Sequence, residues 1–369
     1  MRVAVWIYGG IGSGNFSQGI PHITRLIEKL SAQNEISIYS ILPANKGFVP
    51  KNYLLRTINS KIYFSKIRMV LLIILFFYDH IRKPYNLLHA FWGYPAGTFA
   101  VVLGKLIGLP SVVSLQGGEG ASLPAIHYGN MTNNSVRKIT LWTCENATVL
   151  IAISKFLSNK MVEHGLKRKD VKLILFGADT ELFYPKEKGK DCQLKIIHVA
   201  NLNAVKDQST LLKSFARITK RQPSLLRIIG DGILFNELQQ LTKELGITDY
   251  VEFVGAVPNL QLLPHYHWAD IMLLTSLHEG QAVVVCEALA CKVVVCGTRV
   301  GLIADLANDC CRTSDIGDDK MLAQNALELW NDSFEYKRLQ ENGFTWTQQH
   351  TLAWSVNKIQ NVYNTLMKK

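Results

Sequence analysis

The sequence predicts an α/β protein built from two parallel, doubly wound sheets. In the first half, short apolar runs that are typical of strands alternate with segments of helical periodicity, beginning with a strand at 2–7 and a helix at 17–32. A second series of this kind starts at residue 195, after a polar, charged stretch at 183–191 with the composition of a linker. Strands that alternate with helices form parallel sheets, because each parallel connection needs a long crossover. A chain of 369 residues is long enough for two such domains.

The elements follow in order along the chain. In the first half we expect strands at 2–7, 35–40, 86–90, 111–115, 148–152 and 171–176, with a helix at 96–107. In the second half we expect strands at 195–200, 225–229 and 271–275, an amphipathic helix that ends at Gly246, and a helical segment at 344–369.

A glycine-rich loop follows the first strand. Gly10, Gly12 and Gly14 alternate there, which would let a phosphate group approach the backbone. A dinucleotide site would instead need Gly-x-Gly-x-x-Gly and an acid at the end of the second strand, where this chain has Ser40. The pattern therefore disfavours NAD and leaves two alternatives, a ligand loop and a tight turn without a ligand.

Further candidate side chains follow the next strands. Ligands of a parallel sheet bind at the carboxyl ends of its strands, which places His89, Trp92 and the segment 116–119 at that edge. Gly117 and Gly118 would free backbone N–H groups for binding. The alternative for His89 is a structural role, since a lone histidine among aromatic residues is more often part of a core.

Two glutamates, Glu279 and Glu287, flank a predicted turn between a strand and a helix. This arrangement aims backbone N–H groups and a helix dipole at an anionic ligand. The two acids would lie about two helical turns apart, which suits the hydroxyls of a sugar and of a ribose, with a diphosphate against the amides of 281–284. The alternative is a pair of strands, because Val283, Val284 and Val285 are β-branched.

Composition narrows the classes of partner and compartment. The formal net charge is +11, yet the chain has no dense Arg/Lys run and no zinc-finger spacing, so we expect no nucleic acid partner. Nucleotide sugars and anionic membrane surfaces explain the charge equally well. Seven cysteines without a Cys-x-x-Cys motif predict neither disulfides nor zinc, which favours a cytoplasmic location. The N-terminus enters a strand directly and does not resemble a signal peptide.

An apolar run at 69–78 lies between basic segments at 61–68 and 79–83. Ten residues span only about 15 Å as a helix, which is too short to cross a bilayer. The run is either a core helix or a helix that lies on an anionic membrane, which would make the protein peripheral on the inner face.

Six motifs in order resemble the family-4 (group 1) retaining glycosyltransferases. They are Val199–Leu202 with Lys206-Asp207, Ile229–Gly232, Val254-Gly255, Ala269-Asp270, the Glu279/Glu287 pair, and Gly297-Thr298 with Val300-Gly301. The resemblance implies a GT-B fold, with two Rossmann-like domains that face a central cleft. The domains would be 1–185 on the acceptor side and 191–345 on the nucleotide-sugar side, and a final helix at 346–369 would cross back to the first domain.

The resemblance also implies roles for residues. Catalytic roles would fall to Glu279, Lys206 and His89, with neither a cofactor nor a metal, and no Asp-x-Asp triplet is present. Donor-binding residues would be Glu287, Gly280, Gln281, Ala282, Val283, Gly230, Asp231, Gly232, Asn201 and Arg299. Acceptor-side residues would be Gly12, Gly14, Trp92, Gln116, Gly117, Gly118 and Glu119. The chain departs from the family at Gln116, where a His is common, at Asn201, where an Arg is usual, and at Gln281-Ala282, where Phe-Gly is commoner.

The implied function is transfer of a sugar from a nucleotide-diphosphate sugar to a glycan or lipid-linked acceptor, in cell-surface polysaccharide or glycolipid assembly. Two alternatives stay open: a nucleotide-sugar 2-epimerase of the same fold, and a scaffold that has lost catalysis. A scaffold would be expected to have lost Lys206 or one glutamate, and the chain has kept all three.

Overall fold

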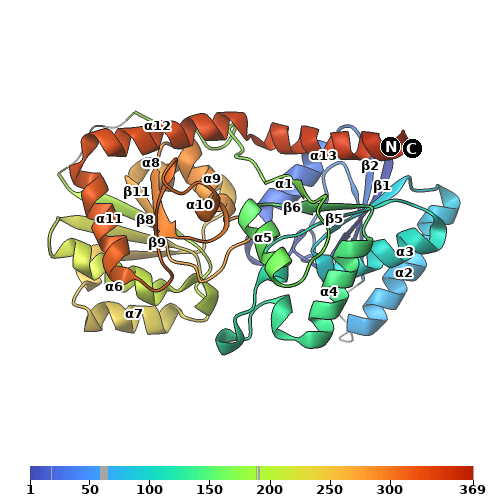
Figure 1. Cartoon of the computed structure of the whole chain (residues 1–369), viewed down its shortest axis with the longest axis horizontal. Coiled ribbons are helices and arrows are strands. Elements are labelled where there is room, and N and C mark those ends of the chain that lie inside the picture. The colour runs from blue at the N-terminus through green and yellow to red at the C-terminus, as the bar shows by residue number, and fades with distance from the viewer. Residues whose placement is uncertain (18, 59–64, 188, 190–191, 369) are drawn as a thin grey trace. The chain divides into compact units, whose positions relative to one another are not determined.

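The computed structural model describes residues 1–17, 19–58, 65–187, 189 and 192–368. The chain divides into two compact units. Unit 1 comprises Met1–Ile153, Leu157–Phe176 and Ala353–Lys369, and unit 2 comprises Ser154–Phe156 and Gly177–Leu352. Each unit contains one parallel sheet with helices on both faces (Figure 1), so the predicted α/β class with two doubly wound sheets is confirmed.

The sheet of unit 1 has the strand order β3-β2-β1-β4-β5-β6-β7 among the described residues. Its strands are β1 (Arg2–Ile7), β2 (Glu35–Ser40), β3 (Leu54–Thr57), β4 (Leu87–Phe91), β5 (Ser111–Ser114), β6 (Val149–Ala152) and β7 (Lys172–Leu173). β3 was not predicted from the sequence. The strand predicted at 171–176 is reduced to two paired residues at the sheet edge.

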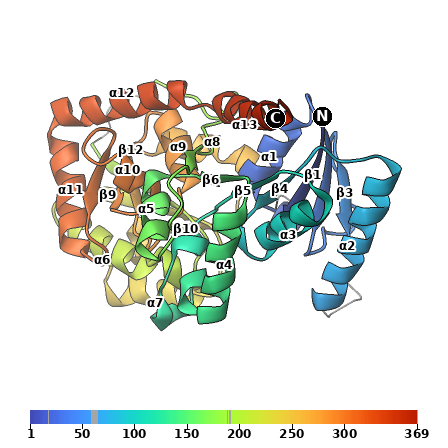
Figure 2. The same cartoon turned by 45° about the vertical axis from the view of Figure 1, so that its right-hand side comes forward.

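The helices of unit 1 are α1 (Pro21–Leu30), α2 (Ser65–Arg82), α3 (Thr98–Ile107), α4 (Asn134–Asn146), α5 (Lys155–Glu163), whose first two residues belong to unit 2, and α13 (Leu352–Met367). The helix predicted from residue 17 begins only at Pro21. Ser17 and Gly19 have positive φ values of 55° and 58°, which a right-handed helix excludes, and proline is favoured in the first turn. In both Figure 1 and Figure 2, α13 lies beside α1, where Asn34 donates to Gln360 Oε1 at 2.7 Å.

The sheet of unit 2 has the order β10-β9-β8-β11-β12-β13 among the described residues. Its strands are β8 (Leu194–Val199), β9 (Ser224–Ile229), β10 (Val251–Gly255), β11 (Ile271–Leu274), β12 (Val294–Thr298) and β13 (Cys311–Ser314). Its helices are α6 (Gln208–Thr219), α7 (Phe235–Glu244), α8 (Leu263–Trp268), α9 (Val283–Ala290), α10 (Gly301–Asp305), α11 (Asp319–Asn331) and α12 (Ser333–Gln349).

The centre of unit 2 shows why a continuous apolar strand forms there. Met272 and Leu274 of β11 belong to the core on one face of the sheet, and Ile271 and Leu273 belong to the core on the other. The following β-branched segment forms α9 and not a strand. Burial of its Val285 against the first of these cores outweighs the strand propensity of valine.

The apolar run at 69–78 lies within α2. Leu72 and Phe76 are fully buried in the core that α2 shares with the sheet and α3. Among the described residues, no helix combines the length and hydropathy that a membrane crossing requires. The start of the predicted basic flank, residues 61–64, lies outside the described residues.

Candidate functional site

Lys206 and Glu279 meet beyond the carboxyl ends of two neighbouring strands, β8 and β11. The Nζ atom of Lys206 donates to Glu279 Oε1, and the side chains are 21% and 10% exposed. Ser276 Oγ donates to the same carboxylate oxygen at 2.6 Å. A charged pair therefore sits partly shielded from water at the edge of the sheet where ligands of such folds bind.

Hydrogen bonds to backbone carbonyls hold the two loops together. Leu277 N donates to Val205 O at 2.8 Å, and Thr275 Oγ1 donates to Lys206 O at 2.9 Å. On the other side, Thr298 Oγ1 donates to Ser276 O at 2.6 Å. The Lys206–Glu279 pair is thus fixed from β8, β11 and β12, and its position does not depend on the ion pair alone.

Gly301 allows the loop of Glu279 to lie close to α10. Its φ is +55°, and a Cβ atom built there would lie 2.7 Å from Glu279 Cβ. Ala282 has a φ of 67° and directly precedes α9, so the residue at this helix end offers no side-chain acceptor to the first amides. Such a helix N-terminus favours an anionic group.

Glu287 lies in α9 and is buried. Its Oε1 accepts from Asn259 Nδ2 at 3.0 Å, and its Oε2 accepts from the hydroxyl of Tyr266 at 2.7 Å. Burial raises the pKa of the Glu287 carboxyl above its ordinary value, and the two hydrogen bonds oppose this shift. The carboxylate is held in one orientation by both partners.

The predicted turn 230–232 packs directly on the loop after β8. A Cβ at Gly230 would lie 1.9 Å from Ala200 O, and one at Gly232 would lie 2.3 Å from Leu202 O. Asp231 accepts from the Gly232 amide at 2.7 Å. Only glycine fits at these two positions, so the turn fixes the course of the loop that leads to Lys206.

Three other predicted donor residues have different settings. Asn201 is exposed, and its carbonyl accepts from Gln208 Nε2 at 3.0 Å. Gln281 is buried, with its amide donating to Cys286 Sγ at 3.4 Å. The guanidinium of Arg299 donates to Thr313 Oγ1 of β13, on the side of β12 away from β11. Arg299 therefore does not join Lys206 as a second cation in this structure.

His89 is fully buried in unit 1. Its Nδ1 is 2.6 Å from the hydroxyl of Tyr363, its Nε2 is 2.8 Å from Ser114 Oγ, and its ring stacks on Phe91. Burial lowers the pKa of His89 to about 3. The predicted catalytic role is not supported by this placement, because an enclosed neutral imidazole cannot reach a substrate. His89 instead links β4 and β5 to α13.

This burial predicts a pH dependence of stability. The pKa of His89 is lower in the folded than in the unfolded chain, so the unfolded state binds more protons in acid and stability falls as the pH falls below about 6.5. Between pH 7 and pH 5 the wild type should lose about 2 kcal/mol more than His89→Gln. Urea unfolding of both proteins at the two pH values measures this difference, and equal losses would contradict it.

The predicted acceptor-side segment of unit 1 is organised by Glu119. This fully buried carboxylate accepts from the amides of Gly93 at 2.7 Å, Gln116 at 3.1 Å and Gly117 at 2.9 Å. The amides of Gln116 and Gly117 are thus engaged within the protein, and for Gly117 this is contrary to the expectation that its amide would be available to a ligand. Glu119 joins the ends of β4 and β5 and acts as an internal anchor.

The remaining acceptor-side residues gather at the same sheet edge. Trp92 follows β4 with a φ of 72°, and its amide donates to Ser114 O at 2.9 Å. In the loop after β1, a Cβ at Gly12 would lie 2.3 Å from the Phe48 ring, whereas one at Gly14 would meet nothing within 4 Å. Gly12 is therefore required by packing, and Gly14 faces open space.

Sequence reasoning missed the residues that orient the two glutamates. Ser276 had a local signal, since a hydroxyl three residues before Glu279 in a turn can reach it. No local sequence pattern indicated Tyr266 or Asn259, because these residues lie 21 and 28 positions before Glu287 in the chain. His198 is another omission: it is fully buried, and its Nδ1 lies 2.8 Å from Leu273 O of β11.

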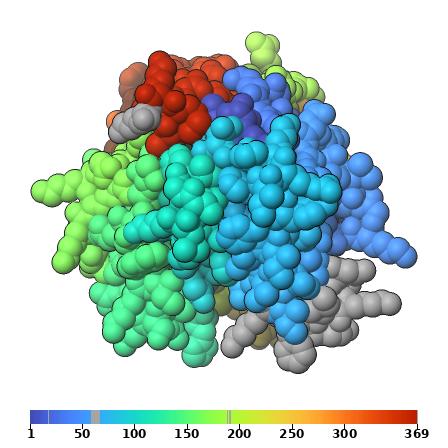
Figure 3. All heavy atoms as spheres, turned by 90° about the vertical axis from the view of Figure 1, so that its right-hand side faces the viewer, coloured from blue at the N-terminus to red at the C-terminus, as the bar shows by residue number. Residues whose placement is uncertain are grey.

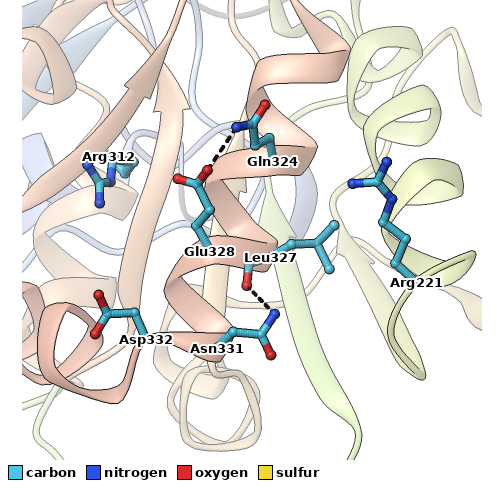
Figure 4. A pocket seen from close by; sticks show the side chains of 7 residues that line it. All are labelled: Arg221, Arg312, Gln324, Leu327, Glu328, Asn331 and Asp332. Atoms are coloured by element: carbon cyan, nitrogen blue, oxygen red, sulfur yellow. Dashed lines mark hydrogen bonds between the residues drawn. The ribbon is translucent and has the colours of Figure 1, made fainter.

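A separate groove of about 740 Å³ lies elsewhere in unit 2 (Figure 4). Its lining residues are Arg221, Arg312, Gln324, Leu327, Glu328, Asn331 and Asp332. The α11 polar groups bond within their own helix, Gln324 to Glu328 at 2.8 Å and Asn331 to Leu327 O at 2.9 Å. The groove contains none of the candidate residues. Among the described residues, no group of three or more His, Cys, Asp or Glu is placed to hold a metal ion.

Comparison with known proteins agrees with this geometry. Residues 166–346 match the family model of group 1 glycosyl transferases. Over 272 residues the chain is 28% identical to N-acetyl-alpha-D-glucosaminyl L-malate synthase of Bacillus anthracis, which covers 70% of this chain and 69% of the relative. These matches support a group 1 glycosyltransferase.

Two solved structures share the fold. Sucrose-phosphate synthase from Thermosynechococcus elongatus has a TM-score of 0.83 and 18% identity, over 100% of this chain and 99% of that chain. Anabaena Alr3699/HepE in complex with UDP-glucose has a TM-score of 0.74 and 15% identity, over 99% of this chain and 100% of that chain. The predicted GT-B fold is confirmed, with two Rossmann-like domains of parallel sheet.

Proposed function

We propose that the chain is a retaining group 1 glycosyltransferase that moves a sugar from a nucleotide-diphosphate sugar to an acceptor hydroxyl. Unit 2 holds the donor, and the loops after β1, β4 and β5 of unit 1 serve the acceptor. The acceptor is a glycan or a lipid-linked glycan of cell-surface polysaccharide or glycolipid assembly.

The observation that carries this proposal is the grouping of Lys206, Glu279 and the N-terminus of α9. A diphosphate needs a cation and amide donors, whereas a neutral sugar needs a fixed acceptor for its hydroxyls. Lys206 supplies the ammonium, α9 supplies the amides, and the carboxylate of Glu279 accepts from sugar hydroxyls. The second carboxylate, Glu287, accepts from the ribose.

In the proposed reaction, the bond between the anomeric carbon and the leaving phosphate oxygen breaks as the acceptor oxygen bonds to the same face of that carbon. The acceptor proton passes to the leaving phosphate. Lys206 and the α9 amides stabilise the charge that develops on the diphosphate. Because these fixed donors replace a metal clamp, the proposed reaction is metal-independent and should continue in the presence of EDTA.

The test is incubation of the purified chain with UDP-, GDP- and ADP-sugars, with and without extract from glycan-producing cells. UDP-sugars are the first choice because the Anabaena structure named above contains UDP-glucose. We expect a glycosylated product whose anomeric configuration, measured by NMR, equals that of the donor. An inverted product would contradict the retaining mechanism.

The matched variant that should lose activity is Glu279→Gln, which keeps the shape of the side chain but removes its charge. Transfer should fall strongly in this variant while its thermal unfolding stays close to that of the wild type. Epimerised donor in the absence of acceptor would favour the 2-epimerase alternative. No turnover of any donor by the wild type would favour the inactive scaffold.

A further inference from the structure

The helix α2 of unit 1 is apolar on two opposite faces. Its inner face, with Leu72 and Phe76, is fully buried against the sheet. Its outer face carries a stripe of large apolar side chains that are 48–79% exposed, namely Ile67, Val70, Ile74, Tyr78 and Ile81. The spacing of three and four residues places all five on one side of the helix. A helix that packs on the sheet of a water-soluble domain normally has a polar outer face.

The neighbouring helices extend this apolar surface. On α3, Val102 and Leu106 are 39% and 70% exposed, and on α4, Ile139 and Trp142 are 37% and 41% exposed. Figure 3 shows α2 and α3 side by side on this face of unit 1, with α4 next to α3. We call these nine residues of the three helices the α2–α4 face. Large apolar side chains exposed together on neighbouring helices are typical of a site of interaction.

Exposed cations accompany the apolar side chains. Arg82 lies over the ring of Tyr78 at 4.5 Å, and Lys105 lies over the ring of Trp142 at 5.4 Å. Lys138 of α4 is also exposed, and Lys83, directly after α2, is exposed but pairs with Glu35. Cations that lie beside tyrosine and tryptophan rings fit the boundary between lipid headgroups and acyl chains.

The carboxylates of the same described helices are few and engaged. Asp79 of α2 is buried and paired with Arg56 at 2.7 Å, and Glu145 of α4 accepts from the Lys167 amide at 2.6 Å. The formal charge of unit 1 as a whole is also positive. Unit 1 has 22 Lys and Arg against 7 Asp and Glu, a formal charge of +15, whereas unit 2 has 18 against 22, a charge of −4.

We propose that the α2–α4 face docks unit 1 onto an anionic lipid bilayer. The apolar stripe of α2 enters the boundary between headgroups and acyl chains, and the cations contact lipid phosphates. Ile67 and Ile81 are separated by about 21 Å along the helix axis, so α2 would lie in the plane of the surface. A second copy of the chain is a poorer occupant, because its own face would bring the same positive charge.

The first test is flotation of the purified chain with vesicles. We expect binding to vesicles of phosphatidylcholine and phosphatidylglycerol at low salt. We expect no binding at high salt, or to vesicles of phosphatidylcholine alone. The double variant Val70→Ser/Ile74→Ser should reduce binding at least tenfold. The control is Ile233→Ser/Phe334→Ser, which removes two apolar side chains of unit 2 that are 88% and 78% exposed and should bind as the wild type does.

The second test separates charge from apolar contact. Lys105→Gln and Lys138→Gln should each weaken vesicle binding about fivefold, whereas Lys320→Gln on α11 of unit 2 should leave it unchanged. Unfolding midpoints of all variants confirm that they are folded. Absence of flotation by the wild type would overturn the proposal. It would also be overturned by a stable dimer in sedimentation experiments that Val70→Ser/Ile74→Ser converts to monomer, because the face would then join two copies.

Discussion

Replacing Lys206 by alanine is expected to lower the turnover number for sugar transfer by roughly 10²–10³-fold, by analogy with the loss of one oxyanion-stabilising donor. The chain has Asn201 where an arginine would supply a second cation, and Arg299 bonds to Thr313 on the far side of β12. The ammonium of Lys206 is therefore the principal positive charge that the proposed donor site offers to the leaving diphosphate. Initial rates with the donor found by incubation with UDP-, GDP- and ADP-sugars measure this loss.

The controls distinguish the charge of Lys206 from its structural contribution. Lys213→Ala removes an exposed lysine of α6 and should leave transfer unchanged. Asn201→Ala should cost less than tenfold, since no formal charge is lost. Lys206→Ala also leaves Glu279 without its cation, so thermal unfolding must be compared with that of Lys206→Met, which retains the volume of the side-chain stem. Normal transfer by both Lys206 variants would mean that the lysine serves only the ion pair.

The pairing of Lys206 with Glu279 bears on how the donor would bind. The carboxylate accepts from both Lys206 and Ser276. This bond neutralises each charge in a partly buried place, where an isolated charge would be costly. The diphosphate would draw the ammonium toward itself, and the sugar hydroxyls would take its place on Glu279. The ion pair thus holds both groups in a defined orientation.

The order of strands and helices could be read from the sequence because it depends on local patterns. The run that became β11 is apolar over the whole length of a buried strand, and those that became β1, β8 and β9 are mostly apolar. The delayed start of α1 had a local signal as well, in the glycine and proline at 19 and 21. β3 lacked such a signal, because an edge strand that is only half-buried carries no continuous apolar run.

The candidate site was predictable only where its residues carry their own motif. Lys206 and Glu279 were identified separately, but their mutual bond joins positions 73 residues apart. The role of His89 depended on Tyr363, which covers it from 274 residues away in α13. Similarly, the capture of the 116 and 117 amides by Glu119 depends on the fold of one short loop. Contacts of this kind are set by tertiary packing, and hydrophobic periodicity does not reveal them.

The second large effect is expected at Glu287. A carboxylate has about four acceptor positions, and Tyr266 and Asn259 use one on each oxygen. One position on each oxygen would then be left for a pair of ribose hydroxyls. Glu287→Gln removes the charge and turns one acceptor into a donor, so the KM for the donor should rise about 10–100-fold while the turnover number changes less. Steady-state kinetics with varied donor concentration measure the KM and the turnover number separately.

Tyr266→Phe tests the same arrangement through a pH profile. The hydrogen bond from Tyr266 lowers the pKa of Glu287 against the effect of burial, so its removal should raise that pKa further. Because the ionised form would bind the ribose, the acidic limb of the kcat/KM profile should move to higher pH in Tyr266→Phe and disappear in Glu287→Gln. Tyr336→Phe is the matched control, since it removes another tyrosine hydroxyl of unit 2, which is partly buried and donates to Asp270 O at 2.9 Å. An acidic limb that is identical in the wild type, Tyr266→Phe and Glu287→Gln would show that Glu287 does not contact the donor. The carboxylate would then have only a structural role, in linking α9 to α8.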